Sequence, residues 1–210
     1  MRVIAIDGPA GSGKSTVARA VAGRLGLDYL DTGAMYRSVA LAALRQGIDP
    51  SNAEVVATLA QRLQIDVGEA VVVDGVDATV EIRSPEVTRV VSVVAANPEV
   101  RREMVRRQRD WAGRRGGGVI EGRDIGSVVF PEADVKVYLT ASDEERASRR
   151  SREVRDLDYG TVAADIARRD HADSTRHASP LAVAGDAVVI DTTGKSVDEV
   201  VADVLALVPA

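Results

Sequence analysis

The chain has 210 residues, of which 45% are apolar and 28% charged, and its formal net charge is −5 at pH 7. This length suits one α/β domain with insertions, while the acidic balance and only six aromatic residues argue against a nucleic-acid-binding surface. Cysteine is absent, which excludes disulfides and thiolate metal sites, and neither a leader nor an apolar run of membrane-spanning length is found, so we expect a cytoplasmic protein without membrane partners.

The first expected strand, Val3–Ile6, leads into a glycine-rich loop that is typical of phosphate binding. Residues 8–15, Gly-Pro-Ala-Gly-Ser-Gly-Lys-Ser, fit the spacing G-x-x-x-x-G-K-S, whose backbone N–H groups surround a di- or triphosphate. Lys14 is expected to reach the β- and γ-phosphates and Ser15 to offer its hydroxyl to Mg²⁺, with the positive N-terminal end of a helix behind them. The alternative is a plain glycine-rich turn between a strand and a helix.

Strand-like runs then alternate with helix-length segments, which is the pattern of a parallel sheet flanked by helices. We expect five central strands, at Val3–Ile6, Tyr29–Leu30, Val119–Glu121, Val135–Leu139 and Ala187–Ile190. Helices are expected at Lys14–Leu25, Ala34–Gln46, Ala53–Leu63, Val87–Ala95, Glu99–Arg109, Asp143–Glu153, Val162–Asp170 and Val197–Leu207.

One segment, residues 64–85, breaks this alternation. It contains two short β runs, Ala70–Val73 and Thr79–Ile82, joined through residues 74–77. The Asp-Gly pair in that joint favours a tight turn, and Pro85 stops the run before the next helix. We therefore predict a small antiparallel β insertion on the α/β core.

Residues 31–37, Asp-Thr-Gly-Ala-Met-Tyr-Arg, follow the second expected strand. They should lie at the carboxyl edge of the sheet beside the phosphate loop, where ligands bind in open α/β sheets. Thr32 is able to cap the following helix, and Asp31 to hold a water on the metal or to orient a ligand. Tyr36 and Arg37 lie one turn further along, within reach of a second phosphate. The alternative is a simple capping turn.

Residues 121–126, Glu-Gly-Arg-Asp-Ile-Gly, follow another expected strand and place Arg123 and Asp124 at the same sheet edge. An Arg–Asp pair is more often a structural salt bridge, and its position alone leaves a functional and a structural role equally open.

Arginines gather in two helix-like segments around an expected loop at residues 156–160. They are Arg146, Arg149, Arg150, Arg152, Arg155, Arg168, Arg169 and Arg176. An enzyme that transfers a phosphoryl group must exclude water, and a closing, positively charged lid does so while neutralising the transferred group. The alternative is a solvated helix face with pairs such as Glu145 with Arg149. We favour the lid for the group as a whole and the solvated face for any single arginine.

Six blocks of this sequence closely resemble the bacterial cytidylate kinases: IDGPAGSGKSTVA, LDTGAMYR, VVVDGVDATVEIRSPEVT, VIEGRDIGSVVFPEADVKVYL, RASRR and RRDHADSTRHASPL. The resemblance implies the P-loop nucleoside monophosphate kinase fold, an α/β fold with a five-stranded parallel sheet flanked by helices, a small antiparallel β insertion and a helical lid. It implies a single kinase chain, 1–210, with a core of residues 1–31, 116–145 and 178–210, a monophosphate-binding region of residues 32–115 that includes the insertion 64–85, and a lid of residues 146–177.

The resemblance also implies Mg²⁺-dependent transfer of the ATP γ-phosphate to CMP or dCMP, directly in line and with lid closure. The ATP-binding residues would be Gly8, Pro9, Ala10, Gly11, Ser12, Gly13, Lys14, Ser15 and Thr16. The catalytic residues would be Lys14, Arg149, Arg150 and Arg169. The acceptor pocket would consist of Thr32, Tyr36, Arg37, Ser92, Arg101, Arg123, Asp124, Asp173 and Arg176. Ser15 would bind Mg²⁺, with Asp31 acting through a water.

Within that assignment, the edge of the cytosine base explains the choice of residues. Asp124 can accept from the exocyclic amine, as acidic side chains do with cytosine in DNA, while Arg101 and Ser92 donate. Uracil has a carbonyl oxygen in place of the amine, and the two facing acceptors would cost roughly 1–3 kcal/mol or more. The α-phosphate is then left to Arg37, Arg123 and Arg176, and the sugar hydroxyls to Asp173.

Two other functions stay open. One is a kinase of the same fold with another acceptor, such as UMP, a different nucleotide or shikimate. The other is a GTP-driven binding switch, although the base-reading Asn-Lys-x-Asp is absent because each lysine follows Gly or Val. Residues 191–194 match D-x-x-G but lie after the last expected strand, so we treat the match as chance. We expect a monomer whose partners are small nucleotides.

Overall fold

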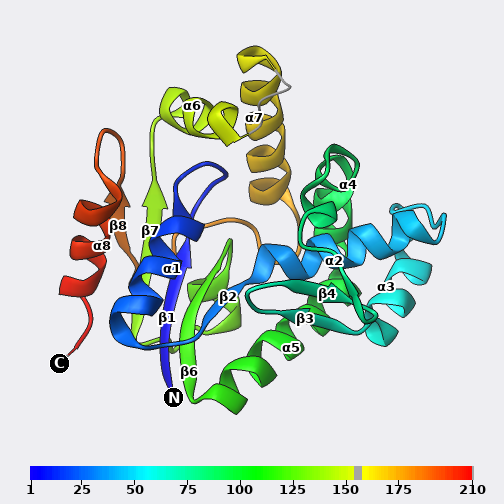
Figure 1. Cartoon of the computed structure of the whole chain (residues 1–210), viewed down its shortest axis with the longest axis horizontal. Coiled ribbons are helices and arrows are strands. Elements are labelled where there is room, and N and C mark those ends of the chain that lie inside the picture. The colour runs from blue at the N-terminus through cyan, green and yellow to red at the C-terminus, as the bar shows by residue number, and fades with distance from the viewer. Residues whose placement is uncertain (154–157, 210) are drawn as a thin grey trace.

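The computed structural model describes residues 1–153 and 158–209, and its centre is a sheet of five parallel strands in the order β2-β6-β1-β7-β8 (Figure 1). The strands are β1 (Arg2–Asp7), β2 (Tyr29–Asp31), β6 (Gly117–Gly122), β7 (Val135–Thr140) and β8 (Val188–Asp191). All of the expected central strands are confirmed, with ends that differ by at most two residues. The carboxyl ends of these strands therefore meet at one edge, as the sequence indicated.

Strand β1 is buried on both faces because helices cover the sheet on each side. Its side chains alternate between two apolar clusters. Val3 and Ala5 pack in the cluster that includes α2 (Thr32–Arg45) and α5 (Pro98–Arg115). Ile4 and Ile6 pack in the other, with α1 (Lys14–Leu25) and α8 (Val197–Ala206). The continuous apolar run before the phosphate loop thus fixes the loop at the middle of the sheet.

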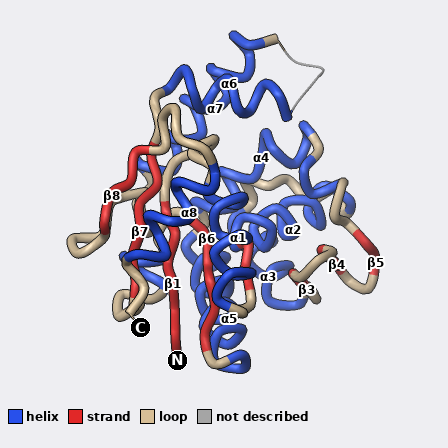
Figure 2. The backbone as a smooth tube through the Cα atoms, turned by 60° about the vertical axis from the view of Figure 1, so that its left-hand side comes forward, coloured by secondary structure: helices blue, strands red, loops and turns tan. Residues whose placement is uncertain are grey.

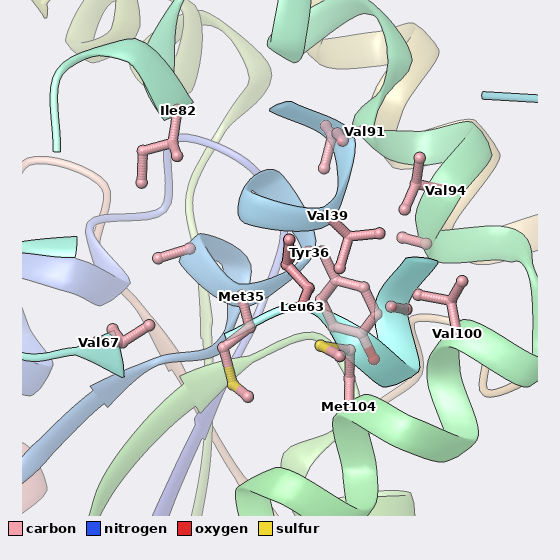
Figure 3. Close-up of a cluster of buried hydrophobic side chains, with 14 of the residues drawn as sticks. Met35, Tyr36, Val39, Leu63, Val67, Ile82, Val91, Val94, Val100 and Met104 are labelled. Carbon is pink, nitrogen blue, oxygen red and sulfur yellow. The ribbon is translucent and has the colours of Figure 1, made fainter. Parts of the chain in front are cut away.

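The cluster that holds Val3 and Ala5 extends into an apolar layer that joins the helices of residues 32–115. It includes α3 (Ala53–Arg62), the 3₁₀ turn η1 (Glu81–Arg83) and α4 (Pro85–Ala96), together with α2 and α5. Figure 3 shows side chains of α2, α4 and α5 meeting in this cluster, among them Met35, Tyr36, Val39, Val91, Val94, Val100 and Met104. Because Tyr36 is anchored in this layer, α2 is held firmly where it enters the site.

The β insertion is a three-stranded antiparallel sheet of β3 (Ile65–Val67), β4 (Val71–Val73) and β5 (Val76–Asp77). It lies apart from the central sheet (Figure 2) and packs on α2. The insertion is confirmed, but the expected second run at residues 79–82 is wrong and β3 was not anticipated. Asp74 and Gly75 both have positive φ, at 49° and 80°, so Val76 pairs directly with Val73. The chain then leaves the sheet and forms η1.

All of the expected helices are present; six of them differ in extent, most of all α5 and α7. Helix α4 begins at Pro85, α5 runs to Arg115, and α7 (Tyr159–Thr175) extends beyond the expected 162–170 at both ends. Asp158 caps α7 by accepting from the Thr161 N–H at 3.0 Å, so Tyr159 and Gly160 are helical rather than part of a loop. The remainder of the expected loop and Arg155 lie outside the described residues. A turn of π-helix, η2 (Ile125–Val129), was not predicted.

Helices α6 (Asp143–Glu153) and α7 stand over the carboxyl edge of the sheet (Figure 1). They share a small apolar cluster formed by Ala147, Val162 and Ile166 with Ala10 of the phosphate loop. None of the helices in the described part of the chain combines the length and the hydropathy that a bilayer crossing requires. The expected α/β architecture with a helical lid is therefore confirmed.

Candidate active site

A cavity of about 540 Å³ lies where the phosphate loop, α2, α4, the end of β6 and the lid helix α7 meet. Most of the expected site residues line it, namely Ala10, Gly11, Gly13, Lys14, Ser15, Thr16, Asp31, Thr32, Tyr36, Arg37, Ser92, Arg101, Arg123, Asp124, Arg150, Arg169, Asp173 and Arg176. The expected residues outside its lining are Gly8, Pro9, Ser12 and Arg149. Residues from distant parts of the sequence thus face one another across a single space.

The phosphate loop is closely packed between the sheet and the lid. Gly11 has a φ of 74°, and a Cβ atom there would lie 2.7 Å from the carbonyl oxygen of Arg146. Only glycine fits this position, because a side chain would be both strained and in contact with backbone. The Lys14 Nζ donates to the Pro9 carbonyl at 2.7 Å, across the loop. Burial, with a contribution from Arg123, lowers the pKa of Lys14 to about 7, so phosphate oxygens are the partners that would favour its charge.

Oxygen atoms that suit Mg²⁺ gather beside the loop. The Ser15 hydroxyl donates to one carboxylate oxygen of Glu121 at 3.0 Å, and the Tyr29 hydroxyl donates to the other. Burial, then the charge of Asp31, raises the pKa of Glu121. In the described ranges, 1–153 and 158–209, no group of three or more acidic or histidine side chains is placed to hold a metal. Mg²⁺ binds through one or two protein oxygens and completes its shell with water and phosphate, and the neighbouring oxygens of Ser15 and Glu121 suit that pattern.

The expected base-reading residues form a buried ion pair. Arg101 donates to Asp124, and their side chains are 4% and 6% exposed. Arg176 lies 3.7 Å from Asp124 and 3.5 Å from Asp173, and the Arg101 guanidinium stands 5.4 Å from the centre of the Tyr36 ring. An acid with two flanking guanidinium groups and an aromatic wall offers both acceptor and donors to a planar base.

Asp7, at the end of β1, holds the turn that carries this acid. Its carboxylate accepts from the backbone N–H groups of Ile125 and Gly126, at 2.9 and 2.8 Å, at the start of η2. Burial raises the pKa of Asp7 to about 6, against the effect of these two hydrogen bonds. The end of the central strand therefore sets the position of Arg123 and Asp124.

On the α2 side, a second ion pair ties the insertion to the core. Arg83 of η1 lies 3.0 Å from Asp31, whose other oxygen accepts from the Ala34 N–H at 3.0 Å. Asp31 is thus the helix cap, and the expectation that Thr32 caps α2 is wrong, because the Thr32 hydroxyl donates to the Glu121 carbonyl at 2.6 Å instead. Burial, followed by the charge of Arg169, lowers the pKa of Arg37 to about 9.

The lid arginines divide into two groups. Arg150 and Arg169 line the cavity, and the Arg169 Nε is buried without a hydrogen-bond partner among the described residues. Burial, followed by the charge of Arg123, lowers the pKa of Arg169 to about 10. Arg149 instead donates to Glu145 at 2.8 Å and to the Thr192 carbonyl at 2.7 Å. The helix-face pair that we weighed as the alternative is therefore present at Arg149.

Thr192 belongs to the D-x-x-G match that we treated as chance. Its buried hydroxyl donates to the carbonyl groups of Ser12, at 3.3 Å, and of Thr140, at 3.0 Å. The segment after β8 consequently supports the phosphate loop from behind, and a structural reason exists for a small hydroxyl residue there.

The comparisons with known proteins agree with this geometry. The family model "Cytidylate kinase" matches residues 4–210. The protein named cytidylate kinase from Desulfitobacterium hafniense is 50% identical over 97% of this chain and 91% of its own length. That from Symbiobacterium thermophilum is 51% identical over 97% of this chain and 94% of its own. The chain belongs to the cytidylate kinase family.

Solved structures share the fold at lower identity. The protein TT1252 from Thermus thermophilus superposes with a TM-score of 0.51 at 22% identity, covering 100% of this chain and 98% of its own. An uncharacterized protein from Eubacterium ventriosum gives a TM-score of 0.53 at 12% identity, covering 98% and 97%. The family model and the two curated relatives confirm the resemblance to cytidylate kinases, and a GTP-driven switch is not favoured.

Sequence reasoning missed some residues that line this cavity or support its walls. They are Asp7, Arg83, Glu121 and Asp170. Glu121 had a detectable signal, because an acid at the end of a strand that precedes a glycine lies at the ligand-binding edge. The others gave none, since their partners are far away in the sequence.

Proposed function

We propose that the protein transfers the γ-phosphate of ATP to CMP or dCMP. One observation carries this proposal, namely that Lys14 of the phosphate loop and the buried pair Arg101–Asp124 line the same cavity. A phosphate-binding loop and a cytosine-reading pair at opposite sides of one space support transfer between two nucleotides rather than binding of one.

On the donor side, the backbone N–H groups of the loop and the Lys14 ammonium hold the phosphates of ATP. Ser15 and Glu121 provide the oxygens that hold Mg²⁺, directly and through water, and Asp31 adds a second carboxylate near them. When bound, the metal neutralises charge on the β- and γ-phosphates.

On the acceptor side, Asp124 accepts from the cytosine amine, while Arg101 and Ser92 donate to the ring nitrogen and the carbonyl. Arg37, Arg123 and Arg176 bind the α-phosphate, and Asp173 meets the sugar hydroxyls. Burial, followed by the charges of neighbouring guanidinium groups, lowers the pKa of Arg37, and a bound phosphate dianion would favour its charged form.

Transfer itself needs no covalent intermediate. An oxygen of the CMP phosphate attacks the γ-phosphorus in line, the bond from that phosphorus to the bridging oxygen of the β-phosphate breaks, and ADP leaves. Arg150 and Arg169 of the lid brace the transferring group while water is excluded. Arg149 reaches that group only by exchanging its contacts with Glu145 and Thr192. We further propose that the protein works as a monomer in the cytoplasm, with free nucleotides as its partners.

The test is an ATP-consumption assay against CMP, dCMP, UMP, AMP, GMP and TMP. We expect phosphorylation of CMP and dCMP above all others. The Lys14→Ala variant should lose roughly 10²–10³-fold in kcat, because a charge on the transferring phosphates is removed. A wild-type protein that phosphorylates another acceptor and ignores CMP would overturn the proposal, as would near-normal turnover by Lys14→Ala.

A further inference from the structure

The two lid helices, α6 and α7, hold one residue of the phosphate loop between them. The Asp170 carboxylate accepts from the Ala10 N–H at 3.0 Å, and the Arg146 guanidinium donates to the Ala10 carbonyl at 3.0 Å. Asp170 and Arg146 also pair with each other. The side chain of Asp170 is 17% exposed, so water screens this contact only in part. Both polar backbone groups of Ala10 are therefore bound by the lid.

The methyl group of Ala10 strengthens the same contact. It is buried in the lid's apolar cluster with Ala147, Val162 and Ile166. Loop and lid thus meet through two hydrogen bonds to the Ala10 backbone and a small buried apolar patch, and the Arg146–Asp170 ion pair joins the two lid helices at this point. All of these contacts are made by protein groups alone.

One turn beyond Asp170, the same helix reaches the acceptor pocket. Asp173 lies 3.1 Å from Arg123 and 3.5 Å from Arg176, and Arg176 lies 3.7 Å from Asp124. Arg123 is shared, because it is also 3.5 Å from Asp170. The position of α7 on the phosphate loop consequently sets the position of the groups proposed to bind the acceptor.

We infer that Asp170 is a positioning residue that keeps α7 docked on the phosphate loop, so that the acceptor pocket is assembled before either nucleotide binds. This inference rests on the proposed function. Docking brings Arg169 to the donor and Asp173 with Arg176 to the acceptor, so both nucleotides bind the docked arrangement better. If only a fraction of the molecules has α7 docked, the apparent affinity for each nucleotide is reduced by that fraction. The first nucleotide to bind shifts the molecules to the docked arrangement and so restores the affinity for the second.

The test compares Asp170→Asn with wild type in calorimetric binding of CMP, with and without Mg²⁺ and a non-hydrolysable ATP analogue. Asn keeps an acceptor for the Ala10 N–H but loses the charge that holds Arg146 and Arg123. We expect CMP alone to bind about tenfold more weakly, the size expected for a charge-assisted hydrogen bond. With the analogue present, most of this loss should disappear. In the steady state, KM for CMP should rise at low ATP while kcat at saturation of both nucleotides stays near wild type.

The matched control is Asp165→Asn, which removes an exposed pair with Arg168 on the same helix and should change none of these values. Should Asp170→Asn fail to fold, Arg146→Lys serves instead. A lysine keeps the charge but has one nitrogen in place of the two that Arg146 uses, Nη1 toward Ala10 and Asp170 and Nη2 toward Asp143. Equal weakening of CMP binding with and without the analogue would overturn the inference, as would unchanged binding. A wild-type protein that neither binds nor phosphorylates CMP would instead overturn the proposed function itself.

Discussion

At Asp124, the proposed choice of cytosine over uracil depends on one carboxylate. Arg101 and Arg176 flank it inside the protein, so its orientation is fixed before the base arrives. In Asp124→Asn, an NH₂ group replaces one carboxylate oxygen. This group cannot accept from the cytosine amine, but it can donate to the uracil carbonyl. We expect kcat/KM for CMP to fall roughly 10–100-fold and the preference for CMP over UMP to shrink, while KM for ATP changes little. Steady-state kinetics with each nucleotide measures this, and equal losses for CMP and ATP would remove Asp124 from the base pocket.

Asp7 makes the stability of the protein depend on pH in a defined window. Burial raises its pKa from 3.8 to about 6, so the folded protein binds the proton more tightly than the unfolded chain does. The stability that protonated Asp7 contributes is complete below pH 3.8 and is lost as the pH rises through about 6. Asp7→Asn does not titrate, so the free energy of unfolding of wild type relative to this variant should fall by about 1–3 kcal/mol between pH 4 and pH 7.

Urea unfolding of both proteins at several pH values measures that difference, in which the titration of all other groups cancels. A difference that stays constant across the window contradicts the raised pKa. A difference that grows with pH contradicts its sign.

At the scale of elements, the contact between the phosphate loop and α6 makes Gly11 sensitive to substitution. Gly11→Ala introduces a Cβ atom 2.7 Å from the Arg146 carbonyl oxygen at a φ of 74°. Gly26→Ala is a matched control, because Gly26 also has a positive φ of 62°, at the end of α1, but a Cβ there meets no atom within 4 Å. Both should lose about 1 kcal/mol of stability from backbone strain. Only Gly11→Ala should also lower kcat, because the new methyl group pushes α6 away from the phosphate loop at Arg146.

Thermal unfolding and kcat measured on the two variants check this prediction. Equal kinetics in both would mean that the loop and α6 do not need their close contact for catalysis.

The β insertion shows what local pattern can predict about an element and what it cannot. The Asp-Gly pair at residues 74–75 indicated a tight hairpin, and the turn is there. The second strand was placed too far along because three of the residues 79–82 are β-branched, which suggested β structure. A two-residue turn instead requires pairing to resume at Val76, and the backbone N–H of Ala78 then closes the sheet on Val71 at 2.8 Å. Turn geometry therefore outweighs strand propensity here.

Over the whole molecule, the lid should open more easily than the sheet. Helices α6 and α7 share only a small apolar cluster, whereas α5 and β6 belong to the large cluster beside the sheet. Local opening is easiest where few buried apolar contacts are lost. Backbone amides of α7 should therefore exchange hydrogen faster than those of α5 and β6, and slow down when an ATP analogue and CMP are bound. Hydrogen exchange followed by mass spectrometry tests this, and equal protection of α7 and β6 would contradict it.

Much of the architecture could be predicted because it follows from local signals. The apolar run before residues 8–15 and the glycine spacing indicated the central strand and the phosphate loop, and both are present. The contacts that join the parts could not be predicted in this way. Asp170 accepts from Ala10 across 160 positions, and Asp7 from Gly126 across 119. The residues next to Asp170 in the sequence look like those around any surface acid, and the residues next to Asp7 look like any strand end.

The spacing of Asp170 and Asp173 limits how the length of this chain can vary in evolution or in design. Each added residue turns everything beyond it by about 100° around the helix axis. An insertion or deletion between the two acids would therefore rotate one of them away from its arginine while the other stayed in register. We expect changes of length in α7 to be tolerated only ahead of Val162, upstream of every α7 group that meets the phosphate loop.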